Sequence, residues 1–196
     1  ALHTKIVLIT SLILIIGPSI LFLILERHAL FADMNTPQAI LNALFCAVTP
    51  RTAGFNTTDI ASLSQSSQLL TIILMFIGGC PGSTAGGAKV TTITVLILYL
   101  RSMLTRTDGA NIFKRRLEDE AVSKAAAVFT THMLLAVVAT FLISMQQDLD
   151  LTVIVFDVVS AVSTVGMSTG ITPHLVPGAK VILILLMFLG RVGRLS

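Results

Sequence analysis

The stretch from Arg51 to Asp59 reads RTAGFNTTD, and the stretch from Ser163 to Ile171, far along the chain, reads STVGMSTGI. Both are polar and rich in hydroxyl groups, and a long apolar run that contains LMFIG or LMFLG follows each of them. Neither stretch is long or apolar enough to cross a bilayer. Their matching positions among apolar segments indicate that the two stretches share one role.

The two stretches belong to a longer repeat that needs no gap. Identical residues recur at one constant offset: Thr52, Gly54, Thr57, Leu63, Leu74, Met75, Phe76 and Gly78 match Thr164, Gly166, Thr169, Leu175, Leu186, Met187, Phe188 and Gly190. Apolar identities between membrane helices arise easily by chance, but the pattern Thr-x-Gly-x-x-Thr lies outside the apolar runs. The chain therefore holds two copies of one unit: span, short helix, glycine turn, span. Parallel copies predict rotational symmetry about the membrane normal, with the turns converging on an axis.

The composition is that of an integral membrane protein. Of the 196 residues, 54% are apolar and only 12% are charged, whereas soluble domains carry about a quarter charged residues. Residues 6–25 contain no charge and are long enough to cross a hydrocarbon core of about 30 Å. The alternative is a signal peptide, but its apolar region would be shorter and a small-residue cleavage site would follow it. Because the chain lacks an initiator Met and stops directly after an apolar run, we expect a fragment of a longer protein.

Four apolar stretches have the composition of membrane spans: 5–25, 68–100, 121–145 and 179–196. The second is interrupted by GGCPGSTAGGAK, from Gly78 to Lys89, which holds five glycines and a proline. These residues break a regular helix. Since lipid does not tolerate exposed irregular backbone, the interruption is predicted to lie against protein or to line a water-filled cavity.

Two shorter apolar segments, Thr36–Val48 and Asp150–Val162, precede the polar stretches. Each begins with a helix-start signal, which is Thr36 followed by Pro37 in the first and Asp150 followed by Leu151 and Thr152 in the second. A short apolar helix followed by a polar turn is typical of a re-entrant pore helix. A strand or an interfacial helix is the alternative for each segment.

The charge distribution predicts the orientation in the membrane. The net charge is only +3, but six of the 13 basic residues lie in or next to one polar connection: Arg101, Arg106, Lys114, Arg115, Arg116 and Lys124. Basic residues beside spans stay on the cytoplasmic side, so the loop 101–120 is expected to be cytoplasmic. Acidic residues dilute this cluster and aromatic residues are lacking, which argues against nucleic acid as a partner. The cysteines, Cys46 and Cys80, have no metal or disulfide spacing and are interpreted as small apolar residues.

The repeated turn has the residue types of a potassium-coordinating loop. A potassium ion in a membrane needs replacements for its water shell, and backbone carbonyls supply them without a full counter-charge. Thr52-Ala53-Gly54-Phe55 and Thr164-Val165-Gly166-Met167 place a glycine where φ must be positive or a side chain would block the path. The second turn shares Thr-Val-Gly with the potassium-channel filter TVGYG.

Two other classes of function fit less well. A phosphate-binding loop needs Gly-Lys followed directly by Ser or Thr, whereas Ala88 separates Gly87 from Lys89 and Val90 follows. We therefore do not expect an enzyme or a cofactor. A structural or receptor-like membrane protein would use its glycines for close packing within continuous helices. The glycines here lie in polar breaks instead.

The motifs TPRTAGFNT (49–57), GGCPGSTAGGAK (78–89) and GRVG (190–193) make the chain similar to the Trk/Ktr/HKT superfamily of potassium transporters, and to its membrane subunit, TrkH or KtrB. That resemblance implies an all-α membrane protein in which four span-pore-span repeats surround one pore. Residues 1–104 resemble the third repeat and residues 121–196 a truncated fourth, with 105–120 as a cytoplasmic linker. The linker, with KRRLEDEAVSKA, favours the Ktr branch over Trk.

The resemblance also implies roles for particular residues. The selectivity filter, with K⁺ bound mainly by backbone carbonyls and no other metal, would comprise Thr52, Ala53, Gly54, Phe55, Thr164, Val165, Gly166 and Met167. An intramembrane gate beneath it would comprise Gly78, Gly79, Gly82, Ser83, Thr84, Gly86, Gly87, Lys89 and Arg191. The expected function is gated potassium uptake across the cell membrane. The expected partners are a second copy of the membrane subunit, the lipid bilayer and a cytoplasmic nucleotide-binding subunit of the KtrA or TrkA type.

Four polar residues leave alternatives open. Arg191, deep in a span, either faces a wet cavity or snorkels to the interface. His132 fits a hydrogen bond in helix packing better than a role in transport. Asp157 either enriches cations near the filter or bonds its neighbours, and Lys89 either bonds carbonyls of the loop or marks the return to water.

Overall fold

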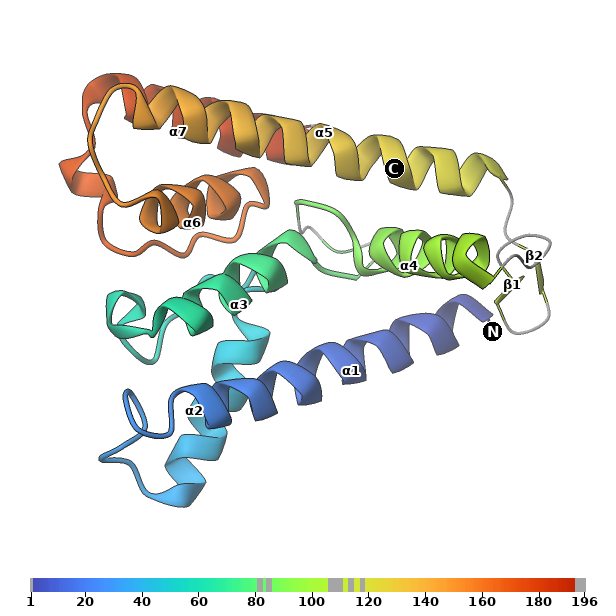
Figure 1. The fold of residues 1–196 in the computed structure, drawn as a ribbon, viewed down its shortest axis with the longest axis horizontal. Coiled ribbons are helices and arrows are strands. Elements are labelled where there is room, and N and C mark those ends of the chain that lie inside the picture. Colours follow the sequence, from blue (N-terminus) through green and yellow to red (C-terminus); the bar gives the residue numbers. More distant parts are fainter. Residues whose placement is uncertain are drawn as a thin grey trace.

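The computed structural model describes residues 2–80, 83, 86–105, 111–112, 115–116 and 119–192. Its regular structure is helical apart from one two-residue strand pair (Figure 1). The elements, in chain order, are α1 (Leu2–Leu25), α2 (Thr36–Val48), the 3-10 turn η1 (Ile60–Ser62), α3 (Gln65–Phe76), α4 (Val90–Thr105), β1 (Asn111–Ile112), β2 (Arg115–Arg116), α5 (Asp119–Ser144), α6 (Leu151–Val162), η2 (Thr172–His174) and α7 (Pro177–Val192).

Two helices in the described part of the chain are long and apolar enough to cross a membrane, over Val7–Leu25 in α1 and Glu120–Ser144 in α5. The stretch 68–100, expected to be an interrupted span, is two shorter helices. The first, α3, begins three residues earlier than expected and ends at Phe76, and α4 runs from Val90 to Thr105. Phe76 is thus the last residue of α3, and Val90 is the first residue of α4.

Both short apolar segments are helices, so the strand alternative is wrong. The bounds of α2 are those predicted, but its N-cap is Asn35, one residue before the predicted start signal, and the Asn35 N–H donates to Oε1 of Gln38 at 3.4 Å. The N-cap of α6 is Asp150, whose Oδ1 accepts from the Thr152 N–H at 3.1 Å. These side chains satisfy backbone donors that a helix start leaves without partners.

The offset that relates the two polar stretches recurs in the secondary structure. The 3-10 turns η1 and η2 begin at Ile60 and Thr172, and the helices that follow them begin at Gln65 and Pro177. The connections before the short helices differ, because ten residues separate α1 from α2 and six separate α5 from α6. The repeat therefore holds best from the polar turns onward.

Helix α6 is the centre of the larger apolar core. Eight of its twelve residues are buried, among them Phe156 and Val158, and α3, α5 and α7 pack around it. A second cluster joins α1, α2 and α3 through side chains such as Phe22 and Leu74. The loops that join α1 to α2 and α5 to α6 lie at the left end of Figure 1, opposite β1 and β2.

The connection at 105–120 contains a short pair of strands. Thr105 is the last residue of α4, and Asp119 already belongs to α5. Between them β1 and β2 pair antiparallel, with Asn111 opposite Arg116 and Ile112 opposite Arg115. A strand is predicted from apolar and polar residues that alternate over four to eight positions. Strands of two residues are too short for this pattern, so the sequence did not predict the pairing.

Candidate functional site

The two polar turns contact each other, although they lie far apart in the sequence. A Cβ added to Gly54 would overlap the carbonyl oxygen of Val165 and would lie 3.6 Å from the Cα of Gly166. Only a residue without a side chain allows this approach of one backbone to the other. The structure thus brings together the centres of the two stretches that were predicted to act together.

The backbone of both turns has the same unusual conformation. Thr52 and Gly54 have φ values of 70° and 72°, and their equivalents Thr164 and Gly166 have φ values of 53° and 89°. A positive φ is uncommon for a non-glycine residue and is strained for a β-branched one. The residues between them, Ala53 and Val165, do not have a positive φ. Alternating handedness turns successive N–H groups to one side of the chain and the carbonyls to the other.

Two N–H groups of each turn donate to the end of the preceding helix. In the first turn the N–H groups of Ala53 and Gly54 donate to the carbonyl of Thr49 at 3.1 and 3.3 Å. In the second turn the N–H groups of Thr164 and Val165 donate to the carbonyls of Ala161 and Ser160 at 3.1 and 2.9 Å. Two backbone donors of each turn are therefore used within its own copy.

The carbonyls of the turns are largely left without donors. Within the described residues, no hydrogen bond reaches the carbonyl oxygens of Thr52, Ala53, Gly54, Thr164, Val165 and Gly166. Phe55 differs, because its carbonyl accepts from Oγ1 of Thr49. Unpaired carbonyls are groups that a cation or water satisfies. The C-terminal ends of α2 and α6, which carry partial negative charge, lead directly into both turns.

The glycine-rich break touches the second turn. The N–H of Gly86 donates to Oγ1 of Thr164 at 2.9 Å, and a Cβ on Gly86 would lie 3.0 Å from the carbonyl oxygen of Ser163. A Cβ on Gly87, where φ is +72°, would lie 3.1 Å from Oγ of Ser163. These glycines allow the break to lie against the start of the turn. The contact gives a packing reason for two adjacent glycines at these positions.

The ends of the break are tied together. The N–H of Gly78 donates to the carbonyl of Ala88 at 2.8 Å, and the N–H of Val90 donates to the carbonyl of Gly79 at 3.2 Å. The Ser83 N–H donates to the carbonyl of Cys80 at 3.1 Å. Of the predicted gate residues, Gly82 and Thr84 lie outside the described residues, and Lys89 precedes α4 directly. The break is thus a loop whose two ends meet.

Arg51, at the start of the first turn, reaches the other side of this loop. One guanidinium nitrogen lies 3.4 Å from Oγ of Ser11 on α1 and 3.9 Å from the Cys80 sulfur. Sequence reasoning assigned no partner to Arg51 and no contact to Cys80. Both turns therefore touch the glycine-rich break, the first through Arg51 and the second through Thr164.

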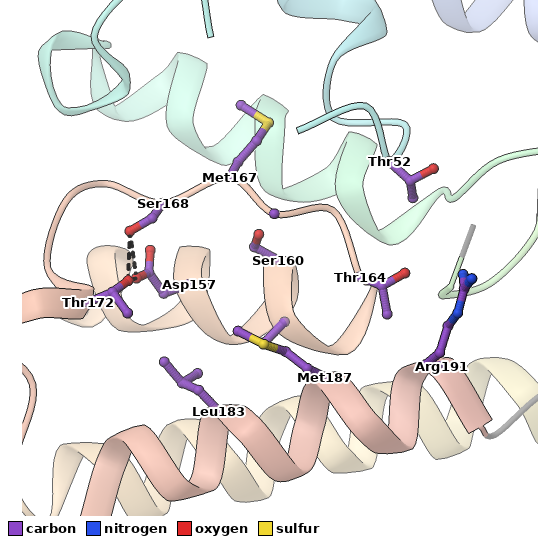
Figure 2. A pocket seen from close by; sticks show the side chains of 12 residues that line it. Thr52, Asp157, Ser160, Thr164, Met167, Ser168, Thr172, Leu183, Met187 and Arg191 are labelled. Carbon is purple, nitrogen blue, oxygen red and sulfur yellow. Dashed lines mark hydrogen bonds between the residues drawn. The ribbon is translucent and has the colours of Figure 1, made fainter. Parts of the chain in front are cut away.

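A cavity of about 500 Å³ lies along the two turns. Thr52, Thr164 and Gly166 line it, together with Asp157 from α6 and Arg191 from α7 (Figure 2). Arg191 therefore lines a cavity that also reaches both turns. Gly190 allows α7 to pack closely against the end of α6 and the second turn. A Cβ at Gly190 would overlap the carbonyl oxygen of Val162 and would lie 3.3 Å from Cγ2 of Thr164.

The carboxylate of Asp157 holds the segment that follows the second turn. It accepts from Oγ of Ser168 and Oγ1 of Thr172, both at 2.9 Å, and from the N–H of Thr169 at 3.2 Å. Figure 2 shows Ser168 and Thr172 beside it. Of the two interpretations, the structure supports bonding to neighbours. The equivalent position in the first copy is Phe45, so this bonding is specific to the second copy.

Two further polar side chains tie the ends of α1 and α5 to the helices after the turns. Oε1 of Glu26 accepts from the Ser64 N–H at 3.0 Å and its hydroxyl at 2.6 Å, and Oε1 of Gln147 accepts from the Val176 N–H at 3.1 Å. Ser64 and Val176 are equivalent positions of the repeat, whereas Glu26 and Gln147 are not related by its offset. The sequence comparison missed this similarity, because the connection from α1 to α2 is longer than the connection from α5 to α6. His132, by contrast, bonds within its own helix, with Nδ1 2.8 Å from the Val128 carbonyl oxygen.

Known proteins are similar to the whole of this chain. A family model described as "TrkH: Cation transport protein" matches residues 1–196. The potassium/sodium uptake protein NtpJ of Enterococcus hirae is 40% identical over 98% of the chain and 44% of its own length. The Ktr system potassium uptake protein B of Bacillus subtilis is 34% identical over all of the chain and 44% of its own length. The chain thus spans less than half the length of these relatives.

A solved structure has the same fold. The potassium transporter TrkH from Vibrio parahaemolyticus superposes with a TM-score of 0.75, at 23% identity, over 93% of this chain and 41% of its own. The family is one of transporters and not of enzymes, and transport implies a location in a membrane. The match over every residue from 1 to 196 shows that the chain belongs to the TrkH family of cation transport proteins.

Proposed function

We propose that the protein containing this chain takes up potassium through a pore whose filter is built from backbone carbonyls. Residues 1–104 and 121–196 act as its third and fourth span-pore-span repeats, with α2 and α6 as re-entrant pore helices. The filter residues are Thr52, Ala53, Gly54, Phe55, Thr164, Val165, Gly166 and Met167. The names of the relatives, which take up potassium or potassium and sodium, support this substrate.

One observation carries the proposal. In each turn two N–H groups donate to the preceding helix, while six carbonyl oxygens at equivalent positions accept no hydrogen bond from the described residues. A row of unpaired carbonyls fits a cation with few or no waters.

The driving force is the membrane potential. An inside-negative potential contributes about 2.3 kcal/mol per unit charge per 100 mV, or roughly fifty-fold accumulation. Passive movement through a gated path therefore suffices for uptake, and the protein needs no cofactor for this step.

The glycine-rich loop 78–89 and Arg191 act as the gate. The hydrogen bond from the Gly86 N–H to Oγ1 of Thr164 supports this role, because it joins the loop to the side chain of a filter residue. Arg191 lies at the cavity that reaches both filter turns, where its charge raises the barrier for a cation. We expect loop opening to break the Gly86 contact and to change the distance between Arg191 and the ion path.

The proposed partners follow from the Ktr system named for one relative. The membrane subunit forms a homodimer in the cell membrane, and a nucleotide-binding subunit of the KtrA or TrkA type docks on the cytoplasmic face. The basic connection at 101–120 provides that face.

Gly54→Ser in the full-length protein tests the filter. The added side chain meets the Val165 carbonyl at a position where φ is positive, so we expect potassium uptake in a potassium-requiring bacterium to fall at least tenfold. Gly17→Ser is the matched control, because a Cβ at Gly17 has no heavy atom within 4 Å. Unchanged uptake in a Gly54→Ser protein that reaches the membrane would remove the filter assignment.

A further inference from the structure

An apolar groove of about 680 Å³ is lined by none of the residues of the two polar turns. Side chains from α3, α4, α5 and α6 line it. Its floor consists of buried residues, including Ile72 on α3, Ala136 on α5 and Val159 on α6. The groove thus lies between the two repeated units and reaches inward to the helix that precedes the second turn.

The rim of the groove is exposed and apolar. Met133, Val137 and Phe141, all on α5, line the groove and are 49%, 57% and 63% exposed. They belong to Glu120–Ser144, one of the two helices apolar and long enough to cross a membrane. The groove is therefore continuous with the surface of a candidate membrane span, and it opens toward hydrocarbon when that span crosses a bilayer.

The groove is long and follows the helix axis. Its lining on α5 extends from Phe129 to Ser144, which corresponds to about 22 Å at 1.5 Å per residue. A hydrocarbon core is about 30 Å thick, so the groove covers more than the depth of one leaflet. Its volume is in the range of ligand sites, roughly 300–1,000 Å³. An extended chain matches this shape better than a compact ligand does.

The groove offers no attraction to water or ions. Thr140 and Ser144 are the polar residues that line it, and the Ser144 hydroxyl already donates to the carbonyl of Phe141 at 2.9 Å. A void beside these side chains would forfeit their dispersion contacts, and water in it would lack hydrogen-bond partners. Hydrocarbon is the filling that avoids both costs.

We propose that this groove binds one acyl chain of a bilayer phospholipid. The bound chain packs against Val155 and Val159 on one side of α6. The other side of α6 carries Asp157 and Ser160, which line the cavity at the turns. The proposal adds a lipid site to the proposed ion path and depends on the membrane location and on the groove facing lipid in the full-length protein. It stands or falls independently of ion selectivity and gating.

Photochemical labelling of the full-length protein tests the site. The protein is placed in nanodiscs of phosphatidylethanolamine and phosphatidylglycerol that contain a phospholipid with a diazirine on its acyl chain. After irradiation, labelled residues are located by peptide mass spectrometry. We expect labels at Val155 and Val159, because Val159 is only 2% exposed and a chain reaches it only through the groove. Labels confined to outward residues such as Leu134 and Val138 would overturn the proposal.

Ala136→Phe fills the floor of the groove and is expected to abolish labelling of Val155 and Val159 while outward labels persist. Leu134→Phe is the control, since Leu134 is 62% exposed on the same helix and does not line the groove. Val137→Trp at the exposed rim provides a second blocking variant if Ala136→Phe unfolds. Persistent α6 labels in the folded blocking variants, or a cross-link from α6 to another protein segment, contradict an acyl-chain site.

Discussion

The backbone N–H of Gly86 donates a hydrogen bond to Oγ1 of Thr164 at 2.9 Å, which joins the break between α3 and α4 to the second polar turn. Thr164 is also one of two threonines held at a positive φ. Its backbone carbonyl and its hydroxyl thus serve two structures, the proposed filter and the proposed gate. A change in the position of the loop therefore changes or breaks a hydrogen bond of Thr164.

Thr164→Val separates these two roles. Valine keeps the β-branched shape but removes the acceptor, which leaves the Gly86 N–H without its partner at a cost of about 1–3 kcal/mol in the closed arrangement. If the loop gates the pore, we expect potassium flux without the regulatory subunit to rise about tenfold, since about 1.4 kcal/mol corresponds to that factor. Flux into proteoliposomes measures it. Thr164→Ser retains the hydroxyl and should stay near wild type; equal flux in all three proteins contradicts the coupling.

Asp157→Asn tests the carboxylate that holds Ser168, Thr169 and Thr172. An amide keeps the size but offers one accepting oxygen in place of two, and charge-assisted hydrogen bonds contribute about 1.5–3 kcal/mol each. We expect a lower unfolding temperature for the full-length protein in detergent, together with weaker discrimination between potassium and sodium. Asp150→Asn is the control, because asparagine caps a helix as well as aspartate does. Equal unfolding temperatures and equal discrimination in both variants would show that the Asp157 carboxylate does not hold this segment.

Glu26 gives stability a dependence on pH. Burial raises the pKa of its carboxyl, but hydrogen bonds from Ser64, Ser67 and the Leu30 backbone outweigh burial and hold the pKa below the ordinary value of 4.5. The unfolded chain therefore binds the proton more readily, so this stabilisation is present above pH 4.5 and is lost as pH falls through the folded pKa.

Glu26→Gln should therefore lower the free energy of unfolding by roughly 1.5–3 kcal/mol at neutral pH, with a difference that shrinks below about pH 4.5. Thermal unfolding of both proteins, measured from neutral pH down to about pH 3.5, checks this expectation. Glu120→Gln serves as comparison, because the Glu120–Lys124 ion pair is 73% exposed on both sides and contributes only about 0.3–0.5 kcal/mol. A pH-independent difference for Glu26→Gln would show that the carboxylate charge does not stabilise the fold.

Gly190→Ala and Gly178→Ala should have opposite effects although both lie in α7. A Cβ at Gly190 meets the backbone carbonyl of Val162, which cannot move without shifting the end of α6. A Cβ at Gly178 meets the end of the flexible Gln146 side chain, and alanine favours the helix by about 0.5–1 kcal/mol. We expect the unfolding temperature to fall for Gly190→Ala and to hold or rise for Gly178→Ala. A stable Gly190→Ala protein with normal uptake would refute the close contact.

Much of the helical pattern was predictable because each element carries a local signal. Long apolar runs predicted α1 and α5, and start signals with apolar runs of about thirteen residues predicted α2 and α6. The glycines and proline after Phe76 predicted the end of α3. The boundaries were less accurate, and the β1–β2 pair was missed, because two-residue strands have no periodicity to read.

The sequence by itself determined that two equivalent polar turns exist, that each follows a short helix, and that a glycine-rich break separates α3 from α4, since these features are local and repeat at one offset. Only the tertiary structure decided that Gly54 faces Val165, that Thr164 bonds the break and that Asp157 holds the segment after its turn. The Glu26 and Gln147 contacts were equally hidden. The physical reason is that such contacts depend on distances between remote segments, which packing around α6 sets and which no local propensity encodes.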